Sequence, residues 1–449
     1  SLVIKIYDTM TRSLRDFVPL TENVVNMYVC GPTVYNYIHI GNARSAVAFD
    51  TIRRYFEYCG YTVNYISNFT DVDDKIIKAA NEAGISTKEL SDKFIAAFME
   101  DTAQLGIKPA TQNPRVINYM DEIIAFVSTL VDKGFAYVSE GDVYFRVAKS
   151  NNYAKLANKT LEDLEIGASG RTDAETERKE NPLDFALWKA AKEGEVSWDS
   201  PWGPGRPGWH IECSVMATEI LGDTIDIHGG GADLEFPHHT NEIAQSEAKT
   251  GKTFANYWMH NGFVNVDNEK MSKSLGNFVT VHDMLKTVDG QVLRFFLATQ
   301  QYRKPINFTE KAIHDAEVNL KYLKNTYSLP LTDQMNQDEL QTYLEAFQTA
   351  MDDDFNTANG VTVLFDMAKW INSGNYDQTV KDAFEKMLQV FGIVFEEEVL
   401  DEDIEKLIEE RQAARANKDF ATADRIRDEL AAQGIKLLDT KDGVRWTRN

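Results

Sequence analysis

Hydrophobic and polar positions in the first third of the chain alternate between a strand pattern and a helical pattern. Apolar runs predict strands at 24–30 and 62–66, and helices are predicted at 43–58, stopped by Gly60, and from about Asp73 onward. This strand–helix–strand–helix order predicts a parallel sheet whose strands are joined by crossover helices.

The middle of the chain interrupts that pattern and then resumes it. A helix is predicted at about 119–133, ended by Gly134, and a strand at 143–147, whereas the polar stretch 151–181 with Gly167 and Gly170 predicts loops. The pattern returns near His210, with a predicted strand at 224–228 and a helix at 240–249. A nucleotide-type fold split by an insertion of about 80 residues is the simplest interpretation.

After Phe308 the apolar period becomes purely helical. Apolar residues recur at steps of three and four in three successive segments, the first capped by Thr309: Ile313, Ala316, Leu320, Leu323 and Tyr327; Leu340, Leu344, Phe347 and Met351; Val361, Leu364, Ala368 and Ile371. These stripes predict the core of a helix bundle. A basic helix at 420–433 and short strands ending at Trp446 predict a small final unit of mixed α/β type.

The fold expected is therefore an α/β, Rossmann-like parallel-sheet domain split by an insertion and followed by an α-helical bundle and a small mixed α/β unit. Six segments are expected: the first half of the split fold at 1–118, a connective insertion at 119–201, the second half at 202–264, a further region at 265–308, a helix bundle at 309–395 and a small final domain at 396–449.

Composition limits the class of protein. No run of about 18 apolar residues predicts a membrane span. Residues 1–8 do not have the basic and apolar pattern of a signal peptide, and three cysteines are too few for a disulfide framework. We interpret the chain as cytoplasmic.

The net charge of −23 argues against nucleic acid as a partner, because phosphate contacts need Lys and Arg. The charge is uneven, however. Residues 396–410 hold nine acids and one base, whereas residues 411–449 hold nine bases and six acids, a net +3. Because the tail is basic, the negative net charge of the whole chain does not exclude RNA binding. The charge of the tail does not by itself establish RNA binding either.

Two short motifs have residues suited to phosphate chemistry. His39-Ile40-Gly41-Asn42 lies where a helix begins, so its backbone N–H groups and imidazole would face an anion. The segment 270–274, Lys-Met-Ser-Lys-Ser, places two lysines three residues apart, which suits a loop that clamps phosphates. Each motif alone also fits an ordinary loop or a solvated basic turn.

A second group has the residue types of a metal site. Cys30 ends the first predicted strand, Cys213 lies in a Gly-Trp-His-Ile-Glu-Cys segment, and His238 and Glu242 are four residues apart, on one face of a helix that Pro237 could start. Two thiols, an imidazole and a carboxylate suit Zn²⁺. Because no compact C-x-x-C occurs, buried thiols and a surface histidine remain the alternative at this point.

Taken together and in this order, the two phosphate motifs resemble the ATP-binding signatures of class I aminoacyl-tRNA synthetases, with Asn42 in place of the second histidine of His-Ile-Gly-His. Residues from MYVCGPT near the start to ADRIRDELAAQGIKLLD near the end, with GWHIEC, HGGGADL and FPHHTNE between them, are similar to the cysteinyl-tRNA synthetase family. The likeness covers essentially the whole chain, and it implies a catalytic role for the split fold, a stem-contact role for 265–308 and anticodon binding for 396–449.

The resemblance implies an enzyme that activates L-cysteine with ATP and attaches it to tRNA(Cys), working as a monomer with one Zn²⁺ and with Mg²⁺ accompanying ATP. It implies the following roles: zinc binding by Cys30, Cys213, His238 and Glu242; ATP binding by His39, Gly41, Asn42, Lys270, Ser272 and Lys273, with His39, Asn42, Lys270 and Lys273 catalytic; cysteine binding by Cys30, Thr70, Trp209 and Asp233; and anticodon binding by Arg415, Phe420, Asp424 and Asp439.

Several of these residues also fit a purely structural role, and the chain also fits other functions. The tail residues could be ordinary surface charges or, for Phe420, a core aromatic, and Trp446 is expected in the core. Cys59 is expected to be a half-buried thiol, and Lys75 and Lys78 to be solvated, although such a pair is linked in some relatives to pyridoxal phosphate. Alternative functions are a ligase joining cysteine to a small amine, a silent tRNA- or zinc-binding paralogue, and a zinc hydrolase with Glu242 as base.

Overall fold

The computed structural model describes residues 3–168, 177–272, 274–333, 337–396, 401–441 and 443–448. The chain divides into two units, one formed by residues 1–323 and 331–393 and the other by residues 324–330 and 394–449. Each unit is described by itself.

Four parallel strands form the central sheet of the first unit, in the order β10 (Ala255–Asn261), β9 (Ile225–Gly231), β3 (Val24–Val29) and β4 (Thr62–Ser67). Met27 of β3 lies opposite both Tyr65 and Ile227, so the two halves of the split fold meet at β3. The predicted parallel sheet is confirmed. Its strands, separated by up to about 160 residues of intervening chain, all end at one edge.

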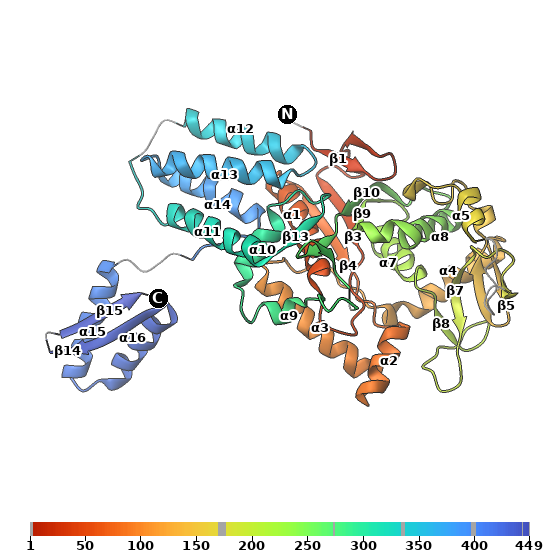
Figure 1. Ribbon diagram of the computed structural model, residues 1–449, viewed down its shortest axis with the longest axis horizontal. Coiled ribbons are helices and arrows are strands. Elements are labelled where there is room, and N and C mark those ends of the chain that lie inside the picture. Colours follow the sequence, from red (N-terminus) through yellow and green to blue (C-terminus); the bar gives the residue numbers. More distant parts are fainter. Residues whose placement is uncertain are drawn as a thin grey trace. The chain divides into compact units, whose positions relative to one another are not determined.

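Helices lie on both sides of this sheet (Figure 1). On one side are α1 (Ile40–Tyr58) and α10 (Gly290–Ala298), and on the other are α7 (Ile211–Leu221) and α8 (Thr240–Thr250). Helical backbone extends from α8 back to Pro237, because within the preceding segment Glu235–His239 only Phe236 has an extended backbone, as residues before proline often do. Pro237 is the first helical residue after this break, so the predicted helix start is confirmed.

The insertion between the two halves contains its own antiparallel sheet. After α4 (Met120–Asp132), the strands follow in the order β5 (Ala136–Ser139), β6 (Asp142–Phe145), β7 (Phe185–Ala190) and β8 (Gly205–Pro207).

The prediction of loops throughout 151–181 is wrong in part, because a 3-10 turn (Lys155–Ala157) and helix α5 (Leu161–Ala168) lie there. The Thr160 hydroxyl accepts a hydrogen bond from the Asp163 N–H, and the Asp163 carboxylate accepts one from the Thr160 N–H. This capping box starts α5. Residues 169–176 of the same stretch lie outside the described residues.

The start of α1 is tied to a second small sheet. Arg44 is fully buried, and its Nη2 donates to the carbonyl oxygens of Gln301, Tyr302 and Lys304 at 3.0–3.1 Å. That segment leads into β13 (Ile306–Phe308), which pairs with β11 (Val264–Val266), which in turn pairs with β12 (Glu269–Lys270). The strand that carries Lys270 is therefore anchored near the helix that begins after His39.

The remaining elements of the first unit frame this core. They are the hairpin β1 (Lys5–Asp8) and β2 (Ser13–Asp16), the helices α2 (Asp74–Ala83), α3 (Thr87–Gln104) and α9 (Val281–Met284), and the helices α12 (Asp338–Asp352), α13 (Thr357–Asn372) and α14 (Gln378–Val390), preceded by α11 (Glu310–Tyr327). Ten of the thirteen positions in the predicted helical stripes are buried, and Leu323, Phe347, Met351 and Leu364 among them are fully buried. Thr309 accepts a hydrogen bond from the Ala312 N–H, as expected of a cap.

The second unit is a small α/β structure, as predicted. Helices α15 (Asp401–Ala416) and α16 (Phe420–Ala432) pack with the hairpin β14 (Ile435–Thr440) and β15 (Gly443–Arg448) around a core of Ile404, Ile408, Ile426, Leu430 and Ile435. Trp446 packs against this core, as expected, and its indole donates to Glu405.

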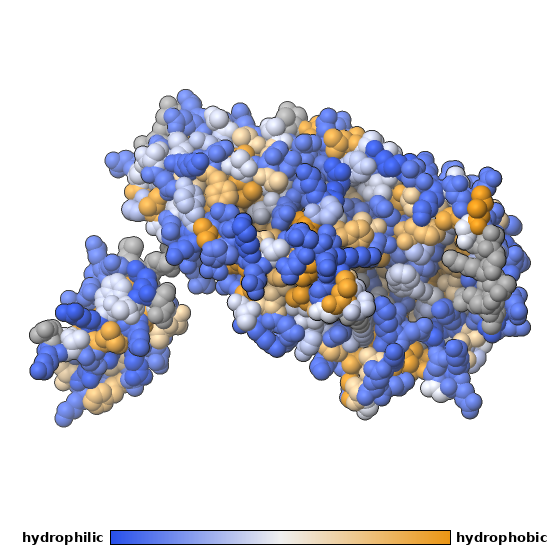
Figure 2. Space-filling model, in the orientation of Figure 1, coloured by the Kyte–Doolittle hydropathy of each residue, from blue (hydrophilic) through white to orange (hydrophobic). Residues whose placement is uncertain are grey.

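Hydrophilic residues cover most of the face of the molecule shown in Figure 2. Within the described residues, no helix combines the length and the apolar character needed to cross a membrane.

Candidate active site

Eleven of the functional residues predicted from the sequence line one cavity of about 640 Å³ at the carboxyl edge of the central sheet. Sites in open α/β sheets typically form at this edge. Cys30 follows β3, Thr70 follows β4 and Asp233 follows β9. These eleven residues are Cys30, His39, Gly41, Asn42, Thr70, Trp209, Cys213, Asp233, His238, Lys270 and Ser272.

Glycine at position 31 brings the first two strand ends together. A Cβ atom there would lie 1.7 Å from the carbonyl oxygen of Asn68, so no other residue fits. The Asn68 side chain accepts a hydrogen bond from the Gly31 N–H at 3.0 Å and donates one to the Thr70 hydroxyl at 3.1 Å. Asn68 thus holds both Cys30 and Thr70 in place, a role that no motif in the sequence indicated.

The start of α1 is organised by His39 itself. Its Nδ1 accepts hydrogen bonds from the N–H groups of Gly41 and Asn42 at 3.0 and 3.3 Å, and the Asn42 side-chain oxygen accepts one from the His39 N–H. The expectation that these N–H groups face an anion is therefore wrong, because the imidazole caps them. With Nδ1 as acceptor, the proton of the neutral ring is on Nε2, which makes Nε2 a donor.

The second phosphate motif approaches the first across the cavity. A Cβ atom on Gly41 would lie 3.8 Å from the side chain of Met271, so the two motifs are neighbours. The Ser272 N–H donates to Asn277 at 2.8 Å, and the Asn277 amide donates to the Lys270 carbonyl at 3.2 Å, which closes the turn. Lys270 is exposed. Lys273 lies outside the described residues.

The four predicted metal ligands converge on one point. Cys30 Sγ lies 3.5 Å from Cys213 Sγ, 3.4 Å from His238 Nε2 and 3.6 Å from Glu242 Oε2. His238 Nε2 is 3.1 Å from Glu242 Oε2. The four ligand atoms all lie within 4.8 Å of one another, and three of the four residues are buried. Two sulfurs, an imidazole nitrogen and a carboxylate oxygen at such distances fit a tetrahedral metal ion.

The two thiols of this cluster differ in how easily they ionise. A hydrogen bond from the Cys30 thiol is the largest effect that lowers the pKa of Cys213, to about 6, so this sulfur is a thiolate at neutral pH. Burial alone raises the pKa of Cys30, and the neighbouring Cys213 and Glu242 raise it further. Burial lowers the pKa of His238, but Glu242 and Cys213 outweigh that effect and raise it. A buried thiolate of this kind is a ready metal ligand.

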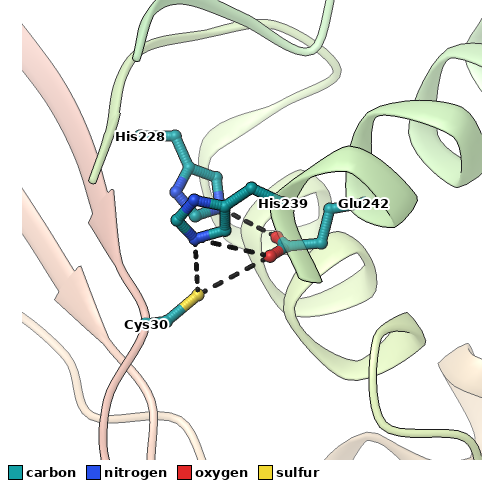
Figure 3. Close-up of side chains that lie close together, drawn as sticks. All are labelled: Cys30, His228, His239 and Glu242. Atoms are coloured by element: carbon teal, nitrogen blue, oxygen red, sulfur yellow. Dashed lines mark hydrogen bonds and ion pairs between the residues drawn. The ribbon is translucent and has the colours of Figure 1, made fainter. Parts of the chain in front are cut away.

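Three further histidines, which sequence reasoning did not assign, form a layer behind the cluster. His228 Nε2 lies 2.8 Å from Glu242 Oε1, and His239 Nε2 lies 3.5 Å from Cys30 Sγ (Figure 3). His239 Nδ1 lies 2.8 Å from His260 Nε2. Cys30, His228, His239 and Glu242 make a second group able to hold a metal ion. The two groups share Cys30 and Glu242, so the geometry alone leaves both sets open.

The residues predicted to bind cysteine surround the metal cluster. Thr70 is buried, whereas Trp209 is 47% exposed and stacks on the His238 ring with 4.7 Å between centroids. Asp233 lies in a single 3-10 turn, Ala232–Leu234, directly after β9. The indole of Trp209 is thus both a wall of the cavity and a contact of a metal ligand.

The tail residues also have defined surroundings within the second unit. Asp439 Oδ1 lies 3.8 Å from the Arg415 guanidinium and 3.9 Å from that of Arg411. Phe420 is 60% exposed, so it is no core aromatic. Asp424 pairs with Arg427 at 3.6 Å.

Cys59, Lys75 and Lys78 have the surroundings expected of residues without a catalytic role. Cys59 is a half-buried thiol at the end of α1, and burial raises its pKa to about 11. Lys75 and Lys78 are exposed on α2.

Comparison with known proteins identifies the domains. Residues 16–318 match the family described as tRNA synthetases class I (C) catalytic domain, residues 346–396 the DALR domain, and residues 397–446 the cysteinyl-tRNA ligase anticodon binding domain. A cysteine–tRNA ligase of Streptococcus thermophilus is 94% identical over 447 residues, and one of Streptococcus agalactiae is 82% identical, each match covering 100% of both chains.

A solved structure shares the fold at low sequence identity. The methionyl-tRNA synthetase of Mycobacterium tuberculosis in complex with methionyl-adenylate aligns with a TM-score of 0.58 at 15% identity, covering 82% of this chain and 89% of that one.

Proposed function

The chain belongs to the cysteine–tRNA ligases of the class I aminoacyl-tRNA synthetases, and on this premise we propose how its residues activate cysteine and deliver it to tRNA. It is an enzyme that uses ATP to join cysteine to tRNA, which sets aside the small-amine ligase, the silent paralogue and the hydrolase. The observation that carries the residue assignments is that one cavity is lined by both ATP motifs and by three of the four metal ligands.

In the activation step, the cysteine carboxylate attacks the α-phosphate of ATP and pyrophosphate leaves. This reaction needs positioning and stabilisation of charge more than proton transfer. His39, through its Nε2–H, and Asn42 bind the phosphates at the start of α1, where Gly41 allows close approach. Lys270 and Lys273 neutralise the charge that develops on the pyrophosphate, and the neutral Ser272 hydroxyl can donate a hydrogen bond to ATP. Mg²⁺ accompanies ATP.

The cysteine thiol is held at the Cys30, Cys213, His238 and Glu242 cluster, which we propose as the Zn²⁺ site. Both groups have donors that suit Zn²⁺, but Cys213 and His238 line the cavity whereas His228 and His239 do not, so a substrate thiol in the cavity can reach this group. When bound, Zn²⁺ supplies an affinity for a thiolate that a hydroxyl cannot match. His228 fixes the Glu242 carboxylate through its 2.8 Å contact. Thr70, Trp209 and Asp233 enclose the rest of the amino acid.

In the transfer step, a hydroxyl of the terminal ribose of tRNA(Cys) attacks the carbonyl carbon of cysteinyl-adenylate and AMP leaves. Residues 265–308 would contact the stem of the tRNA, and Arg415, Phe420, Asp424 and Asp439 its anticodon. The exposed Phe420 ring fits a splayed base, which proteins often bind by stacking on aromatic side chains. We propose a cytoplasmic monomer, which light scattering of the purified protein would check.

The proposed division of labour is tested by ATP–pyrophosphate exchange with cysteine, with serine and without amino acid, together with a zinc assay. Exchange is expected with cysteine alone, and zinc is expected at about one ion per chain. Serine lacks the thiolate that the metal site selects, and an apolar pocket alone would reject it by only about 1–3 kcal/mol. Equal exchange with serine, or active protein without zinc, would overturn the proposed role of the metal.

Lys270 provides a second test. We expect Lys270→Gln to slow cysteine-dependent exchange by about 10- to 100-fold, the effect of losing one hydrogen bond to a charged group. The effect should be on ATP turnover, with the KM for cysteine unchanged. Lys252→Gln, an exposed lysine outside the cavity, is the matched control. An unchanged exchange rate in Lys270→Gln would remove Lys270 from the phosphate site.

A further inference from the structure

Glu212 is a buried carboxylate in the active-site cavity that the mechanism above does not use. It is 2% exposed and lines the same cavity as Cys30, Thr70, Trp209 and Asp233. It is the second residue of α7, next to Cys213. Among the described residues, no side chain or backbone N–H donates a hydrogen bond to it and no cation pairs with it. Glu242, the other fully buried glutamate of the site, contacts Cys30, His228 and His238.

The surroundings of Glu212 are negative. The ionisable groups whose charge acts on Glu212 are Cys213, Asp73 and Asp71, all of which are acids. The two aspartates have other partners: Asp71 binds Arg115 and the Ile117 N–H, and Asp73 accepts from the Lys75 N–H at the start of α2. A buried carboxylate without a donor is costly, and native structures rarely leave one so. A ligand group that is positively charged and donates hydrogen bonds would therefore be stabilised beside Glu212.

The three substrates differ in the charged groups that they could place beside Glu212. ATP and tRNA bring phosphate anions, which the carboxylates would repel. Cysteine brings an α-ammonium group with three N–H donors. With its thiol at the metal cluster, that group lies two carbon atoms from the sulfur, and Glu212 is one residue from the ligand Cys213.

Resting on the proposed function, we propose that Glu212 binds the substrate, its carboxylate accepting a hydrogen bond from the α-ammonium group of cysteine. Asp233 lines the same cavity, so two carboxylates would share three N–H donors. Glu212 thereby selects an amino thiol over a thiol that lacks the ammonium group, a selection that the metal centre cannot make.

The test compares three thiols on full-length, zinc-loaded enzyme: L-cysteine, cysteamine, which keeps the ammonium but lacks the carboxylate, and 3-mercaptopropionate, which keeps the carboxylate but lacks the ammonium. The variant is Glu212→Gln, which has the same shape. The two analogues are measured as competitors of cysteine in ATP–pyrophosphate exchange. Glu219→Gln, at an exposed position on the same helix, is the matched control, and Glu212→Asp keeps a carboxylate and should restore part of the binding.

We expect Glu212→Gln to weaken binding of cysteine and cysteamine by about 10- to 100-fold and to leave 3-mercaptopropionate within about twofold, because only the first two carry the ammonium group. Zinc content and the KM for ATP should equal those of wild type. Equal weakening of all three thiols would mean that Glu212 acts through the metal cluster, and no weakening would mean that it is only a buried acid; either result overturns the proposal. Wild-type enzyme in the same assay separates this failure from failure of the proposed function, which would abolish exchange altogether.

Discussion

Replacing Cys213 with serine is expected to lower the zinc affinity and the rate of cysteine-dependent ATP–pyrophosphate exchange by about 100-fold or more. Removing a group that only supports a metal ligand typically costs about 10- to 100-fold in metal affinity, and loss of a thiolate ligand should exceed that. Cys213 is buried, and its lowered pKa of about 6 makes it the thiolate of the pair. A serine hydroxyl at the same place stays protonated and is a poor ligand.

The measurement combines metal analysis of the dialysed protein with exchange at saturating ATP. Cys59→Ser is the matched control, since Cys59 is a half-buried thiol outside the cavity. A circular dichroism melt shows whether the variant is folded. Wild-type zinc content and exchange in a folded Cys213→Ser protein would transfer the metal to the group of Cys30, His228, His239 and Glu242, which needs no second thiol.

The order of strands and helices was predictable because it depends on local periodicity. The strands at Val24–Val29 and Thr62–Ser67 and the helix between them follow directly from runs of apolar residues. Helix α5 was missed although its capping signal, Thr160 followed three residues later by Asp163, was present in the sequence. The polar composition of that stretch outweighed the cap in the prediction.

The candidate site was predictable only where a motif or the resemblance named its residues. Cys30 and Glu242 are 212 residues apart, and no local pattern shows that their side chains meet. The same holds for Asn68, which joins two strand ends, and for His228 and His239 behind the ligands. Glu212 was visible in the sequence beside Cys213, but its lack of a partner depends on burial and on the positions of distant acids, which only the fold supplies.

The structure also decided between interpretations that the sequence left open in the tail. Phe420 begins α16 and is 60% exposed, whereas Trp446 packs on the core of the small unit. Both are aromatic residues in similar polar surroundings along the chain. Their difference arises because Phe420 directly follows the cap of a helix, while Trp446 is on a strand whose alternate residues face Ile404 and its neighbours.

Ending the chain after Glu396 should leave cysteine-dependent ATP–pyrophosphate exchange within about twofold of wild type and lower kcat/KM for tRNA on the order of a thousandfold. Every residue that lines the active-site cavity precedes this point, as does the helix bundle. The removed residues have their own core around Ile404 and Leu430, so their loss should not open the core of the first unit. Contacts to single bases are typically worth about 1–3 kcal/mol each, and several would be lost together.

Aminoacylation of tRNA(Cys) transcripts, measured beside exchange on the same preparation, checks this expectation. Asp439→Asn in the full-length protein is the companion variant: it removes one charge between Arg411 and Arg415 and should weaken charging by a smaller factor without affecting exchange. If the shortened enzyme charged tRNA as well as wild type, anticodon recognition would have to lie in the first unit. If it lost exchange as well, the tail would be needed to maintain the catalytic cavity, and the assignment of Arg415, Phe420, Asp424 and Asp439 to the anticodon would lose its support.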